Sequence, residues 1–294
     1  MVIARLIGGL GNQMFQYAAA RAIACRIRQE PGLDITAFEN YRLRSYRLGC
    51  FNIVENFVGS EKVRSIRRRQ IGCESGFINK LKWKFLPERR KIFTQQGYHF
   101  HADILKIRKS VYLDGYWQSE KYFSDMADIM RKDFTFRSEP DSENKQLLLK
   151  IESCPSVSLH IRRGDYVNDW DTFTIHGVLS MDYYLRSLDY IAQRVHHPHF
   201  FIFSDDMAWV RQNLKINYPH DFIDHNGAQK DYEDMRLMSH CRHHIIANSS
   251  FSWWGAWLCN HADKIVIAPA RWFSAEEMKK CDQLDILPET WVVI

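Results

Sequence analysis

The sequence has no uninterrupted run of the roughly 20 apolar residues that a membrane-spanning helix requires, so we expect no transmembrane segment. Residues Met1–Ile7 have no basic leader, long apolar stretch or small-residue cleavage site, and we predict a first strand there rather than a signal peptide. The 7 cysteines form no CxxC pair, which argues against a zinc site and a disulfide framework. These absences predict a cytoplasmic protein with reduced thiols.

Several nucleotide-binding and nucleic-acid-binding signatures are also missing. The glycine-rich stretch at 8–13 is followed by Met14 where a dinucleotide fingerprint has its third glycine, which disfavours a Rossmann dehydrogenase. No Gly-Lys-Ser/Thr tripeptide is present, so a P-loop is excluded. There is no internal repeat, no low-complexity tract and no recognisable nucleic-acid module, and we predict no nucleic-acid partner.

The charge is divided unevenly along the 294 residues. Residues 1–150 contain 27 Lys and Arg against 16 Asp and Glu, and residues 151–294 contain 13 against 19. Much of the basic excess lies at 62–69 and 80–91. Two explanations stay open, a solvated helix face, which we favour, and a peripheral contact with the anionic inner face of the cytoplasmic membrane.

Segments typical of strands alternate with segments typical of helices in both halves of the chain, which predicts an α/β protein with parallel sheets. A polar stretch with a proline at 137–144 predicts a boundary, so we expect one Rossmann-like domain at 1–145, a second at 146–294 and a central cleft. The expected strands are 2–7, 33–38, 111–113, 156–161, 200–203, 245–247 and 265–268. The expected helices are 13–28, 119–132, 181–195, 206–215, 231–240 and 252–259.

The turn at 8–13 joins the first expected strand to the first expected helix. Gly9 and Gly11 allow a close backbone approach to a ligand, and a helix N-terminus offers unpaired N–H groups. A tight turn without a ligand fits the spacing equally well. The amides of Asn12 and Gln13 favour a ligand, because they suit sugar hydroxyls or a phosphate ester.

The sequence His-Ile-Arg-Arg-Gly-Asp at 160–165 directly follows a predicted buried strand. Ligands of open α/β sheets lie at the carboxyl ends of the strands, and arginine matches phosphate oxygens. Alternation places His160 and Arg162 on one face and Arg163 on the other. We therefore predict that Arg162 binds an anionic ligand, such as a nucleotide diphosphate. For Arg163 and Asp165 the alternative is a purely structural pairing with each other.

Two further clusters follow predicted strands. Ser204, Asp205 and Asp206 suit either a metal or ribose site or the cap of the next helix, and we favour a cap. Asn248, Ser249, Ser250 and Phe251 lead into a helix, where small uncharged side chains can surround an anion. The tryptophans that follow have the spacing of core packing.

Four stretches together resemble the bacterial α-1,2-fucosyltransferases of glycosyltransferase family 11. They are GGLGNQMFQYA at 8–18, GYWQSEKYF at 115–123, HIRRGD at 160–165 and DYEDMRLMSHCRHHIIANSSFSWWGAWL at 231–258. They span nearly the whole chain and occur in order. The wider group of α-1,2-, α-1,6- and protein O-fucosyltransferases is similar at HxRR and at the serine turn.

The resemblance implies a GT-B architecture, GDP-β-L-fucose as the donor substrate, inversion at the anomeric carbon, and no metal or other cofactor. It also assigns roles by position. Arg162 corresponds to the residue that holds the β-phosphate, His160 to a contact near the nucleotide, and Asp234 to the residue that grips guanine. The turn at 248–250 corresponds to diphosphate ligands, and Gly9, Gly11 and Asn12 to a loop over the diphosphate and fucose.

The expected reaction transfers fucose to the 2-OH of a terminal β-galactoside, in the synthesis of O-antigen, lipopolysaccharide or a related surface glycan. Arg162, with Asn12, would stabilise the departing diphosphate. Asp165, Asp114 and Glu120 are candidate bases. The alternatives are a transferase of another GDP-6-deoxysugar, such as colitose, or of another linkage, and a non-catalytic protein that binds nucleotide sugars or glycans.

Overall fold

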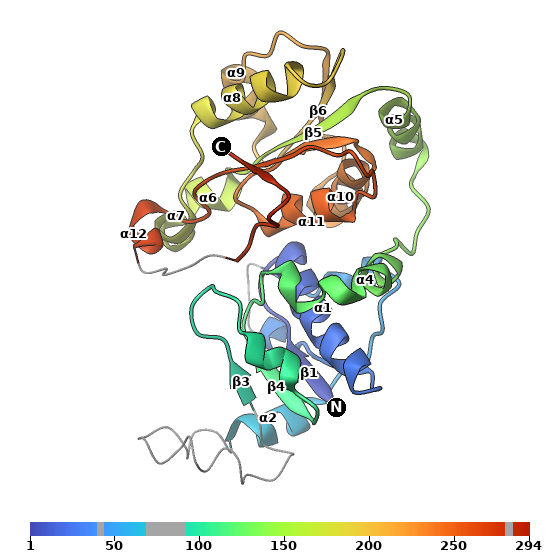
Figure 1. The fold of residues 1–294 in the computed structure, drawn as a ribbon, viewed down its shortest axis with the longest axis vertical. Coiled ribbons are helices and arrows are strands. Elements are labelled where there is room, and N and C mark those ends of the chain that lie inside the picture. The colour runs from blue at the N-terminus through green and yellow to red at the C-terminus, as the bar shows by residue number, and fades with distance from the viewer. Residues whose placement is uncertain (40–43, 69–91, 280–284) are drawn as a thin grey trace. The chain divides into compact units, whose positions relative to one another are not determined.

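The computed structural model describes residues 1–39, 44–68, 92–279 and 285–294. The chain divides into two compact units, each of which is described by itself (Figure 1). The first comprises Met1–Arg137 with Gln283–Ile286, and the second comprises Ser138–Asp282 with Leu287–Ile294. The expected boundary after residue 145 falls inside helix α5 (Ser142–Glu152), which lies in the second unit.

The first unit contains a four-stranded parallel sheet. Its strands lie in the order β2 (Pro31–Asp34), β1 (Val2–Arg5), β4 (Val111–Asp114) and β3 (Ile92–Thr94). Helix α1 (Leu10–Arg26) packs against β1, and most of its residues are buried. The predicted first strand and first helix are therefore confirmed, as is the strand at 111–113.

Two predictions in this unit are wrong. The strand expected at 33–38 ends at Asp34, because Asp34 Oδ1 accepts hydrogen bonds from Thr36 N at 2.9 Å and Thr36 Oγ1 at 2.7 Å, which turns the chain into a 3-10 helix. The single helix expected at 119–132 is broken. Two 3-10 turns, η5 (Glu120–Tyr122) and η6 (Ser124–Met126), precede the short helix α4 (Ala127–Asp133).

The basic run at 62–69 begins on helix α2 (Ser60–Arg68), where Lys62 and Arg64 are exposed. The run at 80–91 lies outside the described residues. Within the described parts of the chain, no helix is both long and apolar enough to cross a bilayer. Peripheral contact with an anionic membrane stays a prediction. The remaining short elements of this unit are the 3-10 helices η1 (Thr36–Glu39), η2 (Leu48–Cys50) and η4 (Ala102–Lys106).

The second unit contains a six-stranded parallel sheet, in the order β10-β9-β8-β5-β6-β7. Counted from β5 in chain order, the strands lie in the order 3-2-1-4-5-6, which is the Rossmann arrangement. Successive strands therefore spread in opposite directions from β5 and β8, and ligands bind at such a switch point. The strands are β5 (Ser156–Ile161), β6 (His199–Ser204), β7 (His220–Ile223), β8 (His243–Ile245), β9 (Val266–Ala268) and β10 (Val292–Val293).

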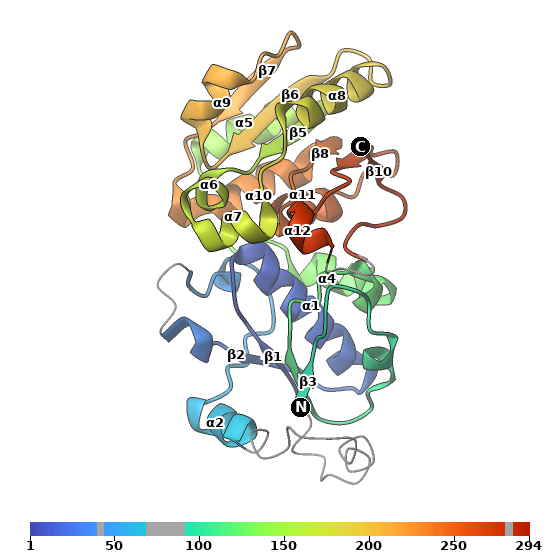
Figure 2. The same ribbon diagram turned by 90° about the vertical axis from the view of Figure 1, so that its left-hand side faces the viewer.

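Helices cover both faces of this sheet (Figure 2). Phe200 and Ile202 of β6 belong to a buried cluster with α8 (Met181–Ala192) and α9 (Met207–Asn213). Phe201 and Phe203 belong to another with α5 and α10 (Asp231–His240). Successive side chains of a strand point to opposite faces, which explains this division. Because helices cover both faces, β6 is apolar from Phe200 to Phe203. The other helices are α6 (Gly164–Asn168), α7 (Trp170–His176), η7 (Ala228–Lys230), α11 (Ser250–Leu258) and α12 (Ala275–Met278).

Candidate functional site

A cavity of about 290 Å³ lies beyond the carboxyl ends of β5, β6 and β7, within the second unit. It brings together three residues predicted from the sequence, His160, Arg162 and Asp234. Asp205, which the sequence suggested for a metal or ribose site or a cap, and Asn226, which it did not suggest, join them. The full lining is His160, Arg162, Phe203, Ser204, Asp205, Asn226, Gly227, Ala228, Asp231, Asp234, Met238 and Phe251.

Arg162 follows the last residue of β5 and is held between two carboxylates. Its Nη2 lies 2.6 Å from Asp165 Oδ1, and its Nη1 lies 3.1 Å from Asp205 Oδ2. Burial alone would lower the pKa of Arg162, but Asp205 and Asp165 outweigh that effect and raise the pKa. The Nε atom is buried and finds no hydrogen-bond partner among the described residues. The guanidinium is therefore fixed in place and retains an N–H for a ligand.

The alternative pairing of Arg163 with Asp165 is wrong, because the Arg163 side chain has another partner. The Nε of Arg163 lies 3.2 Å from Asp206 Oδ2, and its guanidinium carbon lies 3.6 Å from the centre of the Trp209 ring. Asp206 also accepts a hydrogen bond from Trp209 N at 3.2 Å, so the predicted cap of α9 is confirmed. The two adjacent arginines thus have different surroundings. Arg162 lines the cavity, and Arg163 packs against α9.

His160 is buried near the end of β5, with 4% of its surface exposed. Burial lowers its pKa to about 4, so the imidazole is neutral at pH 7. Its Nδ1 has no partner among the described residues, and its ring centre lies 5.8 Å from that of Phe251. The cavity wall here combines an apolar ring with an unused polar atom, which suits a planar heterocycle.

Asp234 reaches the cavity from α10. Asp231, Asp234 and Met238 all line it, and their spacing of three and four residues places them on one face of the helix. Burial raises the pKa of Asp234 to about 7, with Asp231 and Glu233 adding to the effect and a hydrogen bond from Asn226 opposing it. That bond runs from Asn226 Nδ2 to Asp234 Oδ1 at 2.9 Å. The carboxyl group therefore titrates near neutral pH.

The serine turn follows β8 and leads into α11. Ser249 caps this helix by accepting a hydrogen bond from Phe251 N at 3.3 Å, and Ser250 is its first residue. Asn248 donates from Nδ2 to His176 O at 3.0 Å and to Trp272 O at 3.2 Å. Its Oδ1 is buried without a described partner. The amide of Asn248 therefore braces the turn, and α11 presents the N-terminal end of a nine-residue helix.

Tyr166 contacts both the serine turn at 248–250 and Arg162. It was not predicted from the sequence. Its hydroxyl donates to Asn248 O at 3.0 Å, its ring stacks on His176, and Arg162 lies 5.3 Å from its ring centre. The sequence did offer one indication of its role, because Tyr166 lies only four residues after Arg162, on the short helix α6. Arg162 and the serine turn are thus parts of one connected arrangement within the second unit.

The glycine-rich turn lies in the first unit. Gly8 has a φ of +78°, and a Cβ atom there would lie 2.7 Å from Asn12 Nδ2, so both conformation and space favour glycine. Gly9 precedes α1, and Gly11 and Asn12 lie in its first turn. Asn12 Oδ1 accepts a hydrogen bond from Gln118 Nε2 at 2.7 Å, which joins two of the four stretches quoted above. None of these residues belongs to the cavity lining.

The candidate bases differ in their surroundings. Asp165 is engaged by Arg162. Asp114 lies 2.8 Å from Arg5 Nη1. Glu120 begins η5 in the first unit. Among the residues that the structure describes, no group of three His, Cys, Asp or Glu side chains has the arrangement of a metal site.

Two parallel-sheet Rossmann-like units of this kind define the GT-B fold of glycosyltransferases, and the predicted fold class is confirmed. The crystal structure of the α-1,6-fucosyltransferase NodZ soaked with GDP-fucose is similar, with a TM-score of 0.51 at 14% identity, covering 87% of this chain and 91% of that one. The structure of NodZ from Bradyrhizobium aligns equally well, with a TM-score of 0.51 over 86% and 91%.

The sequence comparisons identify the family. The model described as "Glycosyl transferase family 11" matches residues 85–294. An α-1,2-colitosyltransferase of Escherichia coli is 39% identical over 100% of this chain and 99% of that protein. The O-antigen biosynthesis glycosyltransferase WbnK of Escherichia coli is 32% identical, over 94% and 96%. The chain therefore belongs to glycosyltransferase family 11, as the four stretches predicted.

Proposed function

We propose that this glycosyltransferase moves a 6-deoxysugar from a GDP-activated donor to the 2-OH of a terminal β-galactoside, with inversion, and that the sugar is L-fucose. We place the reaction in the synthesis of O-antigen or a related surface glycan, in the cytoplasm. The observation that carries the proposal is the cavity at the carboxyl edge of the Rossmann sheet, which combines a fixed arginine with a partly buried carboxyl group whose pKa is raised. A nucleoside diphosphate has complementary groups at its two ends.

Each end of GDP has a proposed partner in this cavity. When ionised, Asp234 accepts hydrogen bonds from N1–H and the 2-amino group of guanine, and neutral His160 lies beside the nucleotide. Arg162 donates to the β-phosphate, using N–H groups that Asp165 and Asp205 leave unused. Ser249 and Ser250, at the N-terminus of α11, add uncharged donors to the diphosphate. We assign Gly9, Gly11 and Asn12 to a loop over the diphosphate and sugar.

The chemical step breaks the bond between the anomeric carbon and the phosphate oxygen while the acceptor 2-OH attacks the opposite face. Negative charge then grows on GDP, and a cation fixed beforehand at the diphosphate stabilises this charge without reorganisation. We propose that Arg162 supplies that charge, so that no divalent metal is needed. Asp165 acts through Arg162, because it holds the guanidinium 2.6 Å away.

Colitose is a second candidate for the transferred sugar, because a relative 39% identical over the whole chain is named for it. Colitose is L-fucose without its 3-hydroxyl group, so both sugars suit the same GDP site. The choice depends on whether a polar group of the protein hydrogen-bonds that hydroxyl. A site built to bind a hydroxyl discriminates strongly against the analogue that lacks it.

A donor and acceptor array tests the proposal. The purified chain is incubated with GDP-L-fucose or GDP-colitose and a set of β-galactosides, with excess EDTA in half of the samples. We expect GDP release that needs the acceptor and survives EDTA, and linkage analysis that gives an α-1,2 product. Turnover with GDP-colitose alone would replace fucose by colitose. GDP binding without turnover would support a non-catalytic binding protein, and loss of activity in EDTA would contradict metal independence.

Gly164 provides a test of the arginine's setting. A Cβ atom at Gly164 would lie 2.3 Å from Asp205 Oδ2 and 2.9 Å from Asp205 Cγ. Gly164→Ala should therefore displace Asp205 from Arg162 and weaken GDP binding roughly tenfold, the effect of about 1.4 kcal/mol, as measured by calorimetry. Gly59→Ala is the matched control, because no atom lies within 4 Å of a Cβ there. Equal affinities for both variants would contradict a role for the Asp205 contact.

A further inference from the structure

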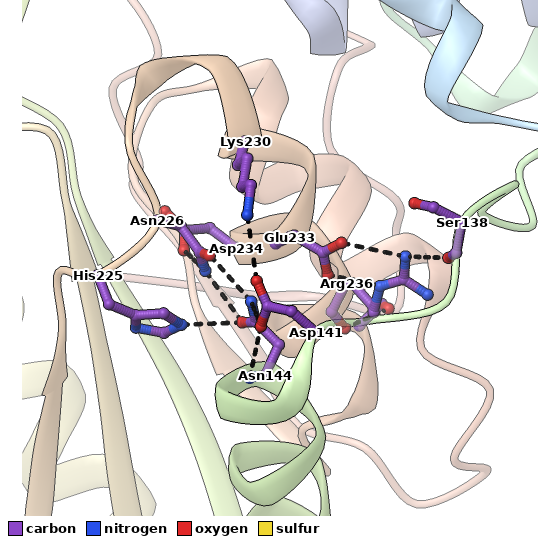
Figure 3. Close-up of polar contacts among 10 residues, drawn as sticks. Ser138, Asp141, Asn144, His225, Asn226, Lys230, Glu233, Asp234 and Arg236 are labelled. Atoms are coloured by element: carbon purple, nitrogen blue, oxygen red, sulfur yellow. Dashed lines mark hydrogen bonds and ion pairs between the residues drawn. The ribbon is translucent and has the colours of Figure 1, made fainter.

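Two paired side-chain amides, one buried and one partly buried, connect the start of α5 to Asp234 (Figure 3). Asn144 lies in the first turn of α5 and is fully buried. Its amide pairs with that of Asn226, which lines the cavity and donates to Asp234. Sequence reasoning singled out Asp234 but neither asparagine. Asn144 itself is not part of the cavity lining.

The amide of Asn144 uses its whole hydrogen-bonding capacity. Its Nδ2 donates to Asp141 Oδ1 at 2.9 Å and to Asn226 Oδ1 at 3.0 Å. Its Oδ1 accepts from Asn226 Nδ2 at 3.1 Å and interacts with His225 Nε2 at 3.0 Å. An amide offers two N–H donors and two acceptor lone pairs, so all four are satisfied. A fully satisfied buried network favours one arrangement over its alternatives.

Carboxylates at both ends fix the direction of this chain. Asp141 and ionised Asp234 only accept hydrogen bonds, so the NH₂ group of each asparagine must face the carboxylate next to it. Turning either amide over would place oxygen against oxygen at two contacts. His225 must then carry a proton on Nε2 in order to donate to Asn144 Oδ1. The network has one consistent set of donors and acceptors.

The outer end of the network is anchored at the start of the second unit. Asp141 caps α5, accepting from Asn144 N at 3.1 Å, and its other oxygen lies 3.2 Å from Lys230 Nζ. Arg236, in a buried ion pair with Glu233, donates to Ser138 O at 2.7 Å. The outer end of the network is therefore tied to the backbone of α5, and Arg236 separately holds the segment that precedes this helix.

We propose that Asn144 is a positioning residue for recognition of the donor's purine base: through Asn226 it holds the Asp234 carboxylate in the orientation that accepts hydrogen bonds from guanine. The inference rests on the proposed function. Asn226 occupies Oδ1 of Asp234, and Oδ2 receives no hydrogen bond from the described residues. The carboxylate therefore keeps acceptor capacity for the base, and its direction is set by a residue outside the cavity.

Base selectivity tests this assignment. Inosine diphosphate lacks the 2-amino group of GDP and is otherwise the same ligand, so the ratio of the two affinities reports how well the carboxylate is aimed. We expect Asn144→Ala to lower GDP affinity roughly tenfold, as loss of a hydrogen bond to a charged group implies, while inosine diphosphate affinity changes much less. In turnover assays, KM for the GDP-sugar should rise and kcat should change little.

Two further variants separate positioning from folding. Ser142→Ala changes an exposed residue of the same helix turn and should bind both nucleotides as the wild type does. Asn144→Ser keeps a donor beside Asp141 but is too short to pair with Asn226, and it should lose selectivity while retaining a cooperative melting transition. Unchanged selectivity in either folded Asn144 variant, or equal losses for both nucleotides, would overturn the inference. If neither variant folds, Asn144 is a structural residue and the assignment falls.

The same measurements on the wild type separate this inference from the function on which it rests. A wild-type chain that binds GDP more tightly than inosine diphosphate supports the proposed function, and loss of that preference in Asn144→Ala supports the positioning role. A wild-type chain without affinity for GDP would overturn the proposed function, and the positioning role with it. GDP selectivity that is present in the wild type and intact in Asn144→Ala would overturn the positioning role alone.

Discussion

Arg162→Ala is expected to lower turnover by on the order of 10²–10³-fold, the usual loss when one preorganised donor to a developing anion is removed. The wild-type guanidinium sits between Asp165 and Asp205 and has a buried Nε without a described partner. Removing it withdraws the cation and leaves the two carboxylates facing the diphosphate. We therefore expect kcat to fall through lost transition-state stabilisation, and donor affinity to fall through repulsion. Steady-state kinetics with varied GDP-sugar measures both effects.

The neighbouring arginine is the matched control for this experiment. Arg163 carries the same charge one residue away, but it packs on Trp209 and pairs with Asp206 outside the cavity lining. Arg163→Ala should lower the melting temperature and retain most of the turnover. Arg162→Lys keeps the charge without the planar fork and should fall between wild type and alanine. Similar turnover losses for Arg162→Ala and Arg163→Ala would contradict a specific role for Arg162 at the diphosphate.

For these two arginines, the sequence predicted the face of the strand on which each lies but not the residues that they contact. Alternation along a strand correctly separated Arg162 from Arg163, because β5 is regular up to Ile161. The same pattern did not identify their partners. Pairing with Asp165 was the structural alternative for Arg163, yet its partner is Asp206, 43 residues away in sequence, because β6 lies beside β5. Strand order determines such pairs, and a single sequence does not reveal it.

The polar network around Asp234 was hidden from the sequence for a related reason. Asn144 and Asn226 are 82 residues apart, and neither lies in an apolar periodic segment that would predict burial. Strand β7 and helix α5, which bring them together, were both missed in the sequence. The segment at 137–144 was interpreted as a polar boundary, and the two units do divide within it, between Arg137 and Ser138. Its second part was missed, because Asp141 there caps helix α5. A segment whose polar residues hydrogen-bond to one another has the same composition as a loop, so the sequence pattern does not distinguish the two.

The second large effect is expected at Asp234. Asp234→Asn should weaken GDP binding by roughly 100-fold, near the upper range for hydrogen bonds to a charged group. Asn226 Nδ2 donates to Oδ1 in the wild type, so it will select the oxygen of the substituted amide. The NH₂ group is then left to face N1–H and the 2-amino group of guanine, which are also donors. Calorimetry with GDP measures the loss, and Asp182→Asn, on exposed α8 surface, is the control.

The dependence of GDP binding on pH follows from the same carboxyl group. Burial raises the pKa of Asp234 to about 7, with the charges of Asp231 and Glu233 adding to the shift and the hydrogen bond from Asn226 opposing it. Arg162, Asp205 and neutral His160 line the same cavity. Below pH 7 the group is mostly protonated, and guanine needs the ionised form. GDP affinity should therefore rise as the pH increases from 6 to 8, and Asp234→Asn should flatten that rise.

Without a ligand, the stability of the folded chain should change with pH in the opposite direction to the GDP affinity. The pKa of Asp234 in the folded chain, about 7, lies above the value of roughly 3.9 for an unfolded aspartate. The folded state therefore binds the extra proton, and its stability decreases as the pH rises between these two values. Asp234→Asn removes the buried charge, so at pH 8 the variant should melt at a higher temperature than the wild type while binding GDP less well. A variant that both melts lower and binds GDP normally would contradict this account, because burial of an ionised carboxylate at a base-binding position predicts both effects together.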